Sequence, residues 1–123
     1  MTSSVDAPLV LDSSNAPHYR WGADCDGWRL LDEPGLSVIE EQVPPGAVEQ
    51  RHHHATSRQF FYVLDGVATL EIDGTVLRIA VGQGAQVAPG QRHRLSNDEA
   101  KPLRFLLCSA PNTRGDRFDE AAQ

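Results

Sequence analysis

An all-β fold, a barrel or double-sheet jelly roll with little or no helix, is the class that this 123-residue sequence predicts. Three observations support it. Short stretches rich in β-branched and aromatic residues alternate with glycine and proline along most of the chain. Residues 67–73 (VATLEID) alternate in polarity, and Asp73-Gly74 follows as a strong hairpin signal. No segment has a helical period, and many short strands separated by turns indicate a barrel or jelly roll.

Six strands are expected between residues 36 and 109, and the last of them is strongly apolar. In chain order they are 36–43, 58–66, 67–73, 75–80, 91–97 and 103–109. Pro44-Pro45-Gly46 ends the first, and residues 82–90 (GQGAQVAPG) are expected to form a turn. Ala68, Leu70 and Ile72 share one face of their strand, because side chains alternate along a strand.

The length suits one domain with one core. Residues 1–17 are polar, contain two prolines and are expected to form a flexible arm. Residues 18–111 form the predicted barrel, and residues 112–123 form a polar tail. Trp21 and Trp28 are expected to pack against the barrel.

The composition argues against several function classes. A net charge of −6 disfavours nucleic acid as a partner, because a basic surface supplies most of that affinity. No apolar run approaches the roughly 20 residues that span a bilayer, and the first residues lack the pattern of a signal peptide. The two cysteines are typical of free thiols. These features predict a cytoplasmic protein with a small-molecule ligand and no membrane partner.

Three consecutive histidines, His52, His53 and His54, stand out in a chain that has five. Along a strand His52 and His54 share a face, which suits a metal site, whereas His53 points away. A third ligand is expected from the next strand, at Gln59, and a fourth at His93. The alternative is a set of polar residues in surface turns, with Gln59 bonded only to water.

The spacing around these histidines resembles the first motif of the cupin family, which is Gly, five residues, His-x-His, three or four residues, Glu, six residues, Gly. In this chain Gly46 precedes His52 and His54 by the right interval, and Gly66 closes the motif. Gln59 stands where the family has Glu, so one residue type departs from the pattern.

The second half of the resemblance lies at His93. The second cupin motif is Gly, five residues, Pro-x-Gly, two residues, His, three residues, Asn, and this chain has Gly82, Gly90, His93 and Asn97 at those positions. Ala88 stands where the motif has proline, and Pro89 follows one residue later. The two motifs together cover residues 46–97, which is most of the expected barrel.

The resemblance implies a cupin double-stranded β-helix with one divalent transition metal bound by His52, His54, Gln59 and His93. Zn, Mn, Fe, Ni, Co and Cu all suit this donor set. Because an amide carries no charge, Gln59 is expected to weaken metal retention and to leave the ion a stronger Lewis acid than a glutamate would.

Strand alternation also predicts a substrate pocket. Phe61 and Val63 share the face of Gln59, and Phe105 and Leu107 of the last strand are expected to form the floor. Arg114 and Arg117 would reach a substrate anion if the tail folds back over the barrel, and the alternative is a solvated tail. No general base stands out beside the ligands, so no catalytic residue is assigned.

The sequence supports two hypotheses about function. The first is a metal-dependent small-molecule enzyme of the dioxygenase, isomerase or lyase/cyclase type, since the cupin family includes these. The alternative is a non-enzymatic barrel that binds a small molecule or sugar as a sensor, without metal if Gln59 and Ala88 mark a degenerate site. A homodimer is expected, because Phe60 and Tyr62 face outward and a bare edge strand favours association.

Overall fold

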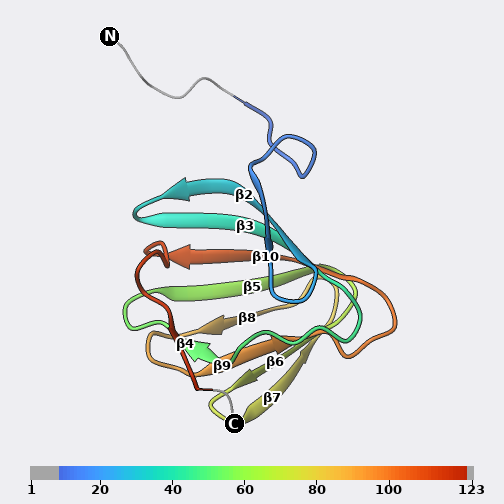
Figure 1. Cartoon of the computed structure of the whole chain (residues 1–123), viewed down its shortest axis with the longest axis vertical. Helices are drawn as coiled ribbons and strands as arrows, with labels where there is room; N and C mark the ends of the chain where they lie inside the picture. The colour runs from blue at the N-terminus through green and yellow to red at the C-terminus, as the bar shows by residue number, and fades with distance from the viewer. Residues whose placement is uncertain (1–8, 122–123) are drawn as a thin grey trace.

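Two antiparallel sheets enclose one apolar core in the computed structural model (Figure 1). The structure describes residues 9–121. Residues 1–8 of the expected arm and residues 122–123 of the expected tail lie outside the described residues. Within the described part there is no helix, in agreement with the all-β prediction.

The larger sheet has six strands in the order β1-β2-β3-β10-β5-β8. Their bounds are β1 His18–Trp21, β2 Cys25–Glu33, β3 Leu36–Val43, β10 Leu103–Ala110, β5 Arg58–Asp65 and β8 Gly84–Val87. The smaller sheet has five strands in the order β11-β4-β9-β6-β7. Their bounds are β11 Phe118–Asp119, β4 His52–His53, β9 His93–Ser96, β6 Ala68–Ile72 and β7 Thr75–Ile79.

All six strands expected from the sequence are present, and the Asp73-Gly74 signal is confirmed as the β6–β7 turn. Ile72 pairs with Thr75, and both turn residues have positive φ, 49° for Asp73 and 89° for Gly74. The structure adds β1, β2, β4, β8 and β11. Strand β8 lies inside the segment expected to be a turn, where Phe61 pairs with Ala85. Pairing with neighbouring strands outweighs the weak local propensity of these segments.

The core lies between the sheets, where alternate side chains of each strand meet. On β5, Phe61 and Val63 are buried while Phe60, Tyr62 and Leu64 are exposed. The largest fully buried apolar side chains are Phe105, Leu70, Leu95 and Leu103. The buried Asn97 amide donates to the carbonyls of Val43 (3.0 Å) and Lys101 (2.9 Å), so this motif residue fixes the loops at one edge of the core.

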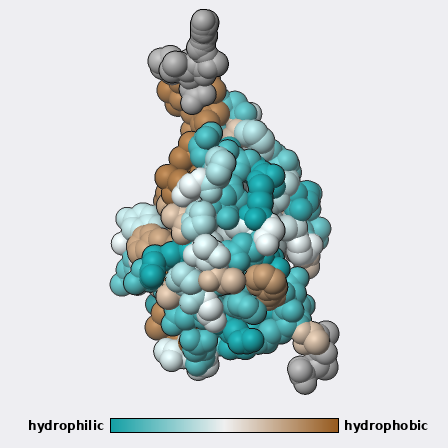
Figure 2. All heavy atoms as spheres, turned by 90° about the vertical axis from the view of Figure 1, so that its left-hand side faces the viewer, coloured by the Kyte–Doolittle hydropathy of each residue, from teal (hydrophilic) through white to brown (hydrophobic). Residues whose placement is uncertain are grey.

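Polar side chains cover most of the face shown in Figure 2, and its apolar atoms are concentrated toward the N-terminal segment at the top. Leu9 and Val10, in that segment, are strongly exposed. Among residues 9–121 no helix has the length and apolar character required to cross a membrane.

The segment expected to form a polar tail returns to the barrel along β4. Phe118 pairs with His53 and Asp119 with His52, and the Glu120 amide donates to the Arg51 carbonyl (2.9 Å). Just before β11, the Asp116 carboxylate accepts hydrogen bonds from the backbone amides of residues 55–57 at 2.8–3.3 Å. The loop after the histidines is therefore held by residues about 60 positions later in the chain.

Candidate metal centre and its pocket

Three histidines meet inside the barrel. His52 on β4 pairs directly with His93 on β9, and His54 follows two residues later on the same face as His52. One ring nitrogen of each lies within 4.8 Å of the others, and all three side chains are buried. Strand pairing and alternation thus bring together the residues that the sequence singled out.

Each of these histidines donates a hydrogen bond from its Nδ1 to a backbone carbonyl. The bonds run from His52 to Gln50 (2.8 Å), from His54 to Asp116 (2.6 Å) and from His93 to Gln91 (3.0 Å). Because a carbonyl oxygen only accepts, the proton of each neutral ring is on Nδ1. Each Nε2 therefore keeps its lone pair for a ligand, and the same carbonyls orient the rings.

Gln59, predicted as the fourth ligand, lines the same pocket as His52 and His54. Its side chain is 4% exposed, and its Nε2 donates to the Ser109 hydroxyl (3.0 Å). Within the described residues, Gln59 Oε1 and the Nε2 atoms of His54 and His93 are buried without a hydrogen-bond partner. Buried polar atoms are seldom left in this way. Three imidazole nitrogens and one amide oxygen with free lone pairs fit a divalent transition metal.

Burial keeps the histidines neutral. It is the main cause that lowers the pKa of His52 to about 3 and lowers the pKa of His54 and His93, while their carbonyl partners act in the opposite direction. At neutral pH the three rings are therefore unprotonated, which is the form that binds a metal ion.

Two carboxyl groups, one buried and one half-buried, share the pocket, and neither was predicted from the sequence. Glu41 on β3 is 8% exposed and accepts a hydrogen bond from the Tyr19 hydroxyl (2.7 Å). Glu49 is half-buried, and its Oε1 accepts from the Leu95 amide (3.0 Å). Burial raises the pKa of Glu41 to about 7 and, with the nearby charge of Glu41, that of Glu49 to about 8.

Alternation along β3 was the signal that could have identified Glu41. Ser37 and Glu41 are buried, and both line the pocket together with Ile39, two residues from each. Glu40, between them, faces outward and pairs with Arg104 (2.6 Å). The expected strand 36–43 already contained this pattern, which places Glu41 on the inner face.

A glycine makes room for the tyrosine that bonds Glu41. Gly27 on β2 lies opposite Glu41 on β3 and opposite Tyr19 on β1. A Cβ atom at Gly27 would fall on the Tyr19 ring, so only glycine lets the ring cross the strand to reach the carboxyl group. Burial and the Glu41 charge raise the pKa of Tyr19, so its hydroxyl stays protonated and donates.

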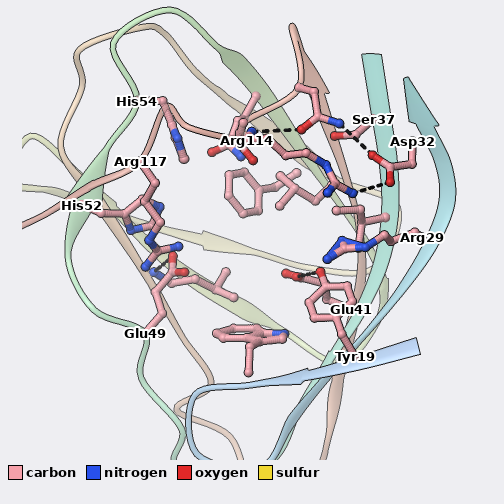
Figure 3. Close-up of a pocket in the computed structure, with 18 residues that line it drawn as sticks. Tyr19, Arg29, Asp32, Ser37, Glu41, Glu49, His52, His54, Arg114 and Arg117 are labelled. Carbon is pink, nitrogen blue, oxygen red and sulfur yellow. Dashed lines mark hydrogen bonds and ion pairs between the residues drawn. The ribbon is translucent and has the colours of Figure 1, made fainter. Parts of the chain in front are cut away.

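Three arginines reach the same pocket (Figure 3). Arg29 lies over the Tyr19 ring, 4.2 Å from its centroid. Arg114 is ion-paired with Asp32, and Arg117 with Asp119 (2.7 Å). The returning C-terminal segment therefore carries both tail arginines to the pocket.

The pocket has a volume of about 260 Å³. Of the four apolar residues expected to line it, Phe61 and Leu107 do so, whereas Val63 and Phe105 are buried in the core behind them. Trp21, expected only to pack, also lines the pocket. His53 faces away from the site, and its ring stacks on Phe118 at 5.2 Å between centroids.

Comparison with known families agrees with this geometry. Residues 39–109 match the Cupin_2 family model, described as a cupin domain. The matched region includes both histidine motifs and Gln59, and it ends on β10.

Two relatives illustrate the range of the similarity. An uncharacterised protein of Methanocaldococcus jannaschii is 31% identical over 61% of this chain and 60% of its own length. Tetracenomycin polyketide synthase protein TcmJ of Streptomyces glaucescens is 27% identical over 85% of this chain and 72% of its own length. The chain thus spans less than two thirds of the first of these relatives.

Among solved structures, the polyketide cyclase RemF of Streptomyces resistomycificus superposes with a TM-score of 0.79. The superposition covers 95% of this chain and 88% of that protein, at 16% sequence identity. At this identity the likeness concerns the fold.

Proposed function

This chain belongs to the cupin family, and from that premise we propose that it is a metal-dependent enzyme acting on a small carbonyl compound. The observation that carries the proposal is the convergence of three ring nitrogens, from His52, His54 and His93, within 4.8 Å of one another, with the unpaired Gln59 Oε1 in the adjoining pocket. A pocket of about 260 Å³ adjoins them, which suits a small organic molecule.

A divalent ion held by these four residues would supply Lewis acidity and stabilise negative charge on a substrate oxygen. The chain's own residues would bind and orient the substrate. Phe61 and Leu107 offer apolar surface to the carbon skeleton, and Arg29 offers a guanidinium to an anionic group. Because Gln59 is uncharged, the site would keep about two positive charges, which favours enolisable or anionic substrates.

Two further observations narrow the type of reaction that we propose for this site. The relatives include proteins whose names refer to polyketide synthesis, and the structural neighbour RemF is named a polyketide cyclase. Chemistry of that kind proceeds through proton transfer next to a carbonyl group. The pocket offers buried carboxyl groups for such a transfer, so we favour a cyclase, lyase or isomerase over a dioxygenase.

The first test is elemental analysis of protein purified without a nickel column. The parent is compared with a His52→Ala/His54→Ala double variant, and His53→Ala is the matched control because its ring points away from the site. We expect about one metal ion per chain in the parent and the control, and almost none in the double variant. A parent that stays metal-free after supplementation would contradict the proposal.

A second measurement separates an enzyme from a structural metal site. The protein is loaded with Co²⁺ and its visible spectrum is followed while pyruvate, a small enolisable acid, is added. A spectral change that saturates with increasing pyruvate concentration indicates that a substrate-sized acid reaches the ion. An unchanged spectrum would favour a closed, structural site and a binding function.

We also propose a homodimer in a reducing, cytoplasmic environment. Phe60, Tyr62 and Leu64 form an exposed apolar row on the outer face of β5, and both cysteines are free thiols. Light scattering of the parent beside Tyr62→Glu tests the dimer. A parent of monomer mass would contradict it.

A further inference from the structure

We propose that Glu41 and Glu49 are a catalytic acid–base pair, in which Glu41 removes a proton from the carbon next to a substrate carbonyl and Glu49 donates one to the carbonyl oxygen. Tyr19 acts as a positioning residue that holds Glu41. The inference rests on the proposed function, because it assigns the proton transfer that such a reaction requires.

The two carboxyl groups lie on different sides of one cavity. Figure 3 shows Glu49 on the same side as His52 and Arg117, and Glu41 on the other side beside Tyr19 and Arg29. A carbonyl compound whose oxygen is directed toward the histidines has Glu49 near that oxygen. Its neighbouring carbon is then directed across the cavity toward Glu41. The arrangement therefore places one carboxyl group at each end of an enolising C–C=O unit.

No ion pair accounts for the placement of these carboxyl groups in the pocket. The ion pairs of the described residues involve other acidic side chains, and neither Glu41 nor Glu49 takes part in one. Burying a carboxylate without a cation is unfavourable. A hydrophobic residue at either position would avoid that cost, so two such groups in one pocket point to chemistry.

Their hydrogen bonds distinguish the two roles. Glu41 Oε2 accepts from the Tyr19 hydroxyl, which stabilises the charged form and leaves Oε1 to act as base. Glu49 accepts at Oε1 from the Leu95 amide, which leaves Oε2 to carry a proton. The pKa order agrees, since the pKa of Glu41 is raised to about 7 and that of Glu49 to about 8.

Enolisation moves one proton onto Glu41 and one proton from Glu49 to the substrate. The Glu41 carboxylate takes a proton from the carbon, and the C–H electron pair becomes the carbon–carbon double bond of the enol. The carbonyl π pair moves to oxygen, which takes the proton of the Glu49 carboxylic acid. One ketone becomes one enol, while Glu41 gains a proton and Glu49 loses one. The reverse step restores both groups.

The experiment measures proton exchange on pyruvate. Metal-loaded protein is incubated with pyruvate in D₂O, and loss of the methyl proton signal is followed by NMR. We expect Glu41→Gln and Glu49→Gln each to slow the catalysed exchange by roughly 100-fold or more. Glu40→Gln is the matched control, because it makes the same change on the outer face of the same strand and should exchange like the parent.

Tyr19→Phe tests the positioning role. Loss of one hydrogen bond to Glu41 should slow exchange by roughly tenfold. It should also shift the ascending limb of the pH–rate profile to higher pH, because the Glu41 carboxylate loses a stabilising donor. The charged groups acting on Glu41, namely Glu49, Arg29 and Arg117, are unchanged in this variant. A slower rate with an unmoved profile would overturn the positioning role.

An infrared measurement on metal-free protein gives a readout that is independent of turnover. Near pH 6 the parent should show protonated buried carboxyl groups, and each glutamine variant should lose one of the corresponding bands. Parent spectra without such bands would overturn the assignment of Glu49 as the acid.

The outcomes separate this inference from the proposed function. If the parent binds metal and exchanges pyruvate protons but both glutamine variants match it within threefold, the pair is wrong and the metal site stands. The pair is also overturned if pyruvate protons exchange no faster with the metal-loaded parent than in buffer without protein. If the parent binds no metal, the proposed function itself fails.

Discussion

The histidine cluster (His52, His54 and His93) and the carboxyl pair (Glu41 and Glu49) occupy one pocket but are built differently. Each histidine is oriented by a backbone carbonyl that bonds its Nδ1, so the cluster is fixed by the main chain. Each carboxyl group is held by one donor, a tyrosine hydroxyl or a backbone amide, and keeps a second oxygen for other contacts. The cluster is arranged to bind, and the pair is arranged to exchange a proton.

Burial acts on the two groups in opposite directions. It lowers the pKa values of the histidines, which are uncharged near neutral pH, and raises those of the carboxyl groups, so that Glu49 is mainly protonated and Glu41 is divided between its two forms. A buried ionisable group that is neutral costs much less than a charged one. The protein can therefore place many ionisable groups in this pocket and still fold.

The largest expected effect is a pH-dependent stability in metal-free protein. The carboxyl pair binds protons more tightly when folded, so stability falls as pH rises from 4.5, the unfolded value, through about 7 and 8. His52 binds protons less tightly when folded, so stability falls as pH drops from 6.5 through about 3. Each group contributes at most about 1.4 kcal/mol per pH unit.

Urea unfolding between pH 4 and pH 9 checks this prediction. We expect a maximum between about pH 4.5 and 6.5, where the two slopes oppose each other. Glu49→Gln should flatten the alkaline limb and leave the acidic limb unchanged. A parent whose stability is constant from pH 6 to pH 8.5 would show that the carboxyl pair is ionised in the folded protein.

The support of the histidine cluster is tested by Asp116→Ala. The carboxylate accepts hydrogen bonds from three backbone amides of residues 55–57, and the Asp116 carbonyl orients His54. Removing the side chain should destabilise the protein by about 2–3 kcal/mol, as expected for loss of a charged acceptor. Asp98→Ala, at an exposed carboxylate, is the control. Equal unfolding midpoints for the two variants would contradict this role.

The histidine cluster could be predicted from the sequence because its signals are local. Motif spacing and strand alternation direct His52 and His54, on and just after β4, and Gln59, on β5 of the other sheet, into the interior between the sheets. Glu41 could have been identified by the same alternation. Tyr19 could not, because its bond to Glu41 depends on pairing of β1 and β2 in segments with no strand signal. The position of Arg117 likewise depends on β11, whose two residues carry no pattern of their own.

A smaller effect is expected where the carboxyl pair depends on packing. Gly27→Ala places a methyl group on the Tyr19 ring and should destabilise the protein by about 2 kcal/mol. It should also displace the hydroxyl from Glu41. Gly35→Ala is the matched control, because a Cβ there meets no atom within 4 Å. Thermal unfolding of both variants measures the difference, and similar melting temperatures would show that the ring moves freely.

The smallest expected effect concerns the charge of the fourth donor. Gln59→Glu adds a carboxylate beside the histidines and should raise metal affinity by roughly tenfold, about 1.4 kcal/mol, through charge attraction. Gln86→Glu, on the outer face of the paired strand β8, is the control for net charge. Competition with a chelating dye measures both affinities. An unchanged affinity would mean that Gln59 does not contact the ion.

The bond between His54 and Asp116 has a consequence for synthesis on the ribosome. The two residues are 62 positions apart, and the first histidine motif, residues 46–66, is synthesised well before residue 116. A nascent chain that ends between them presents His52 and His54 while the His54 ring still lacks its carbonyl partner and the neighbouring loop lacks its anchor. Metal captured at this stage would be held by a partly organised site. Mature affinity and selectivity would be acquired only when the late segment docks.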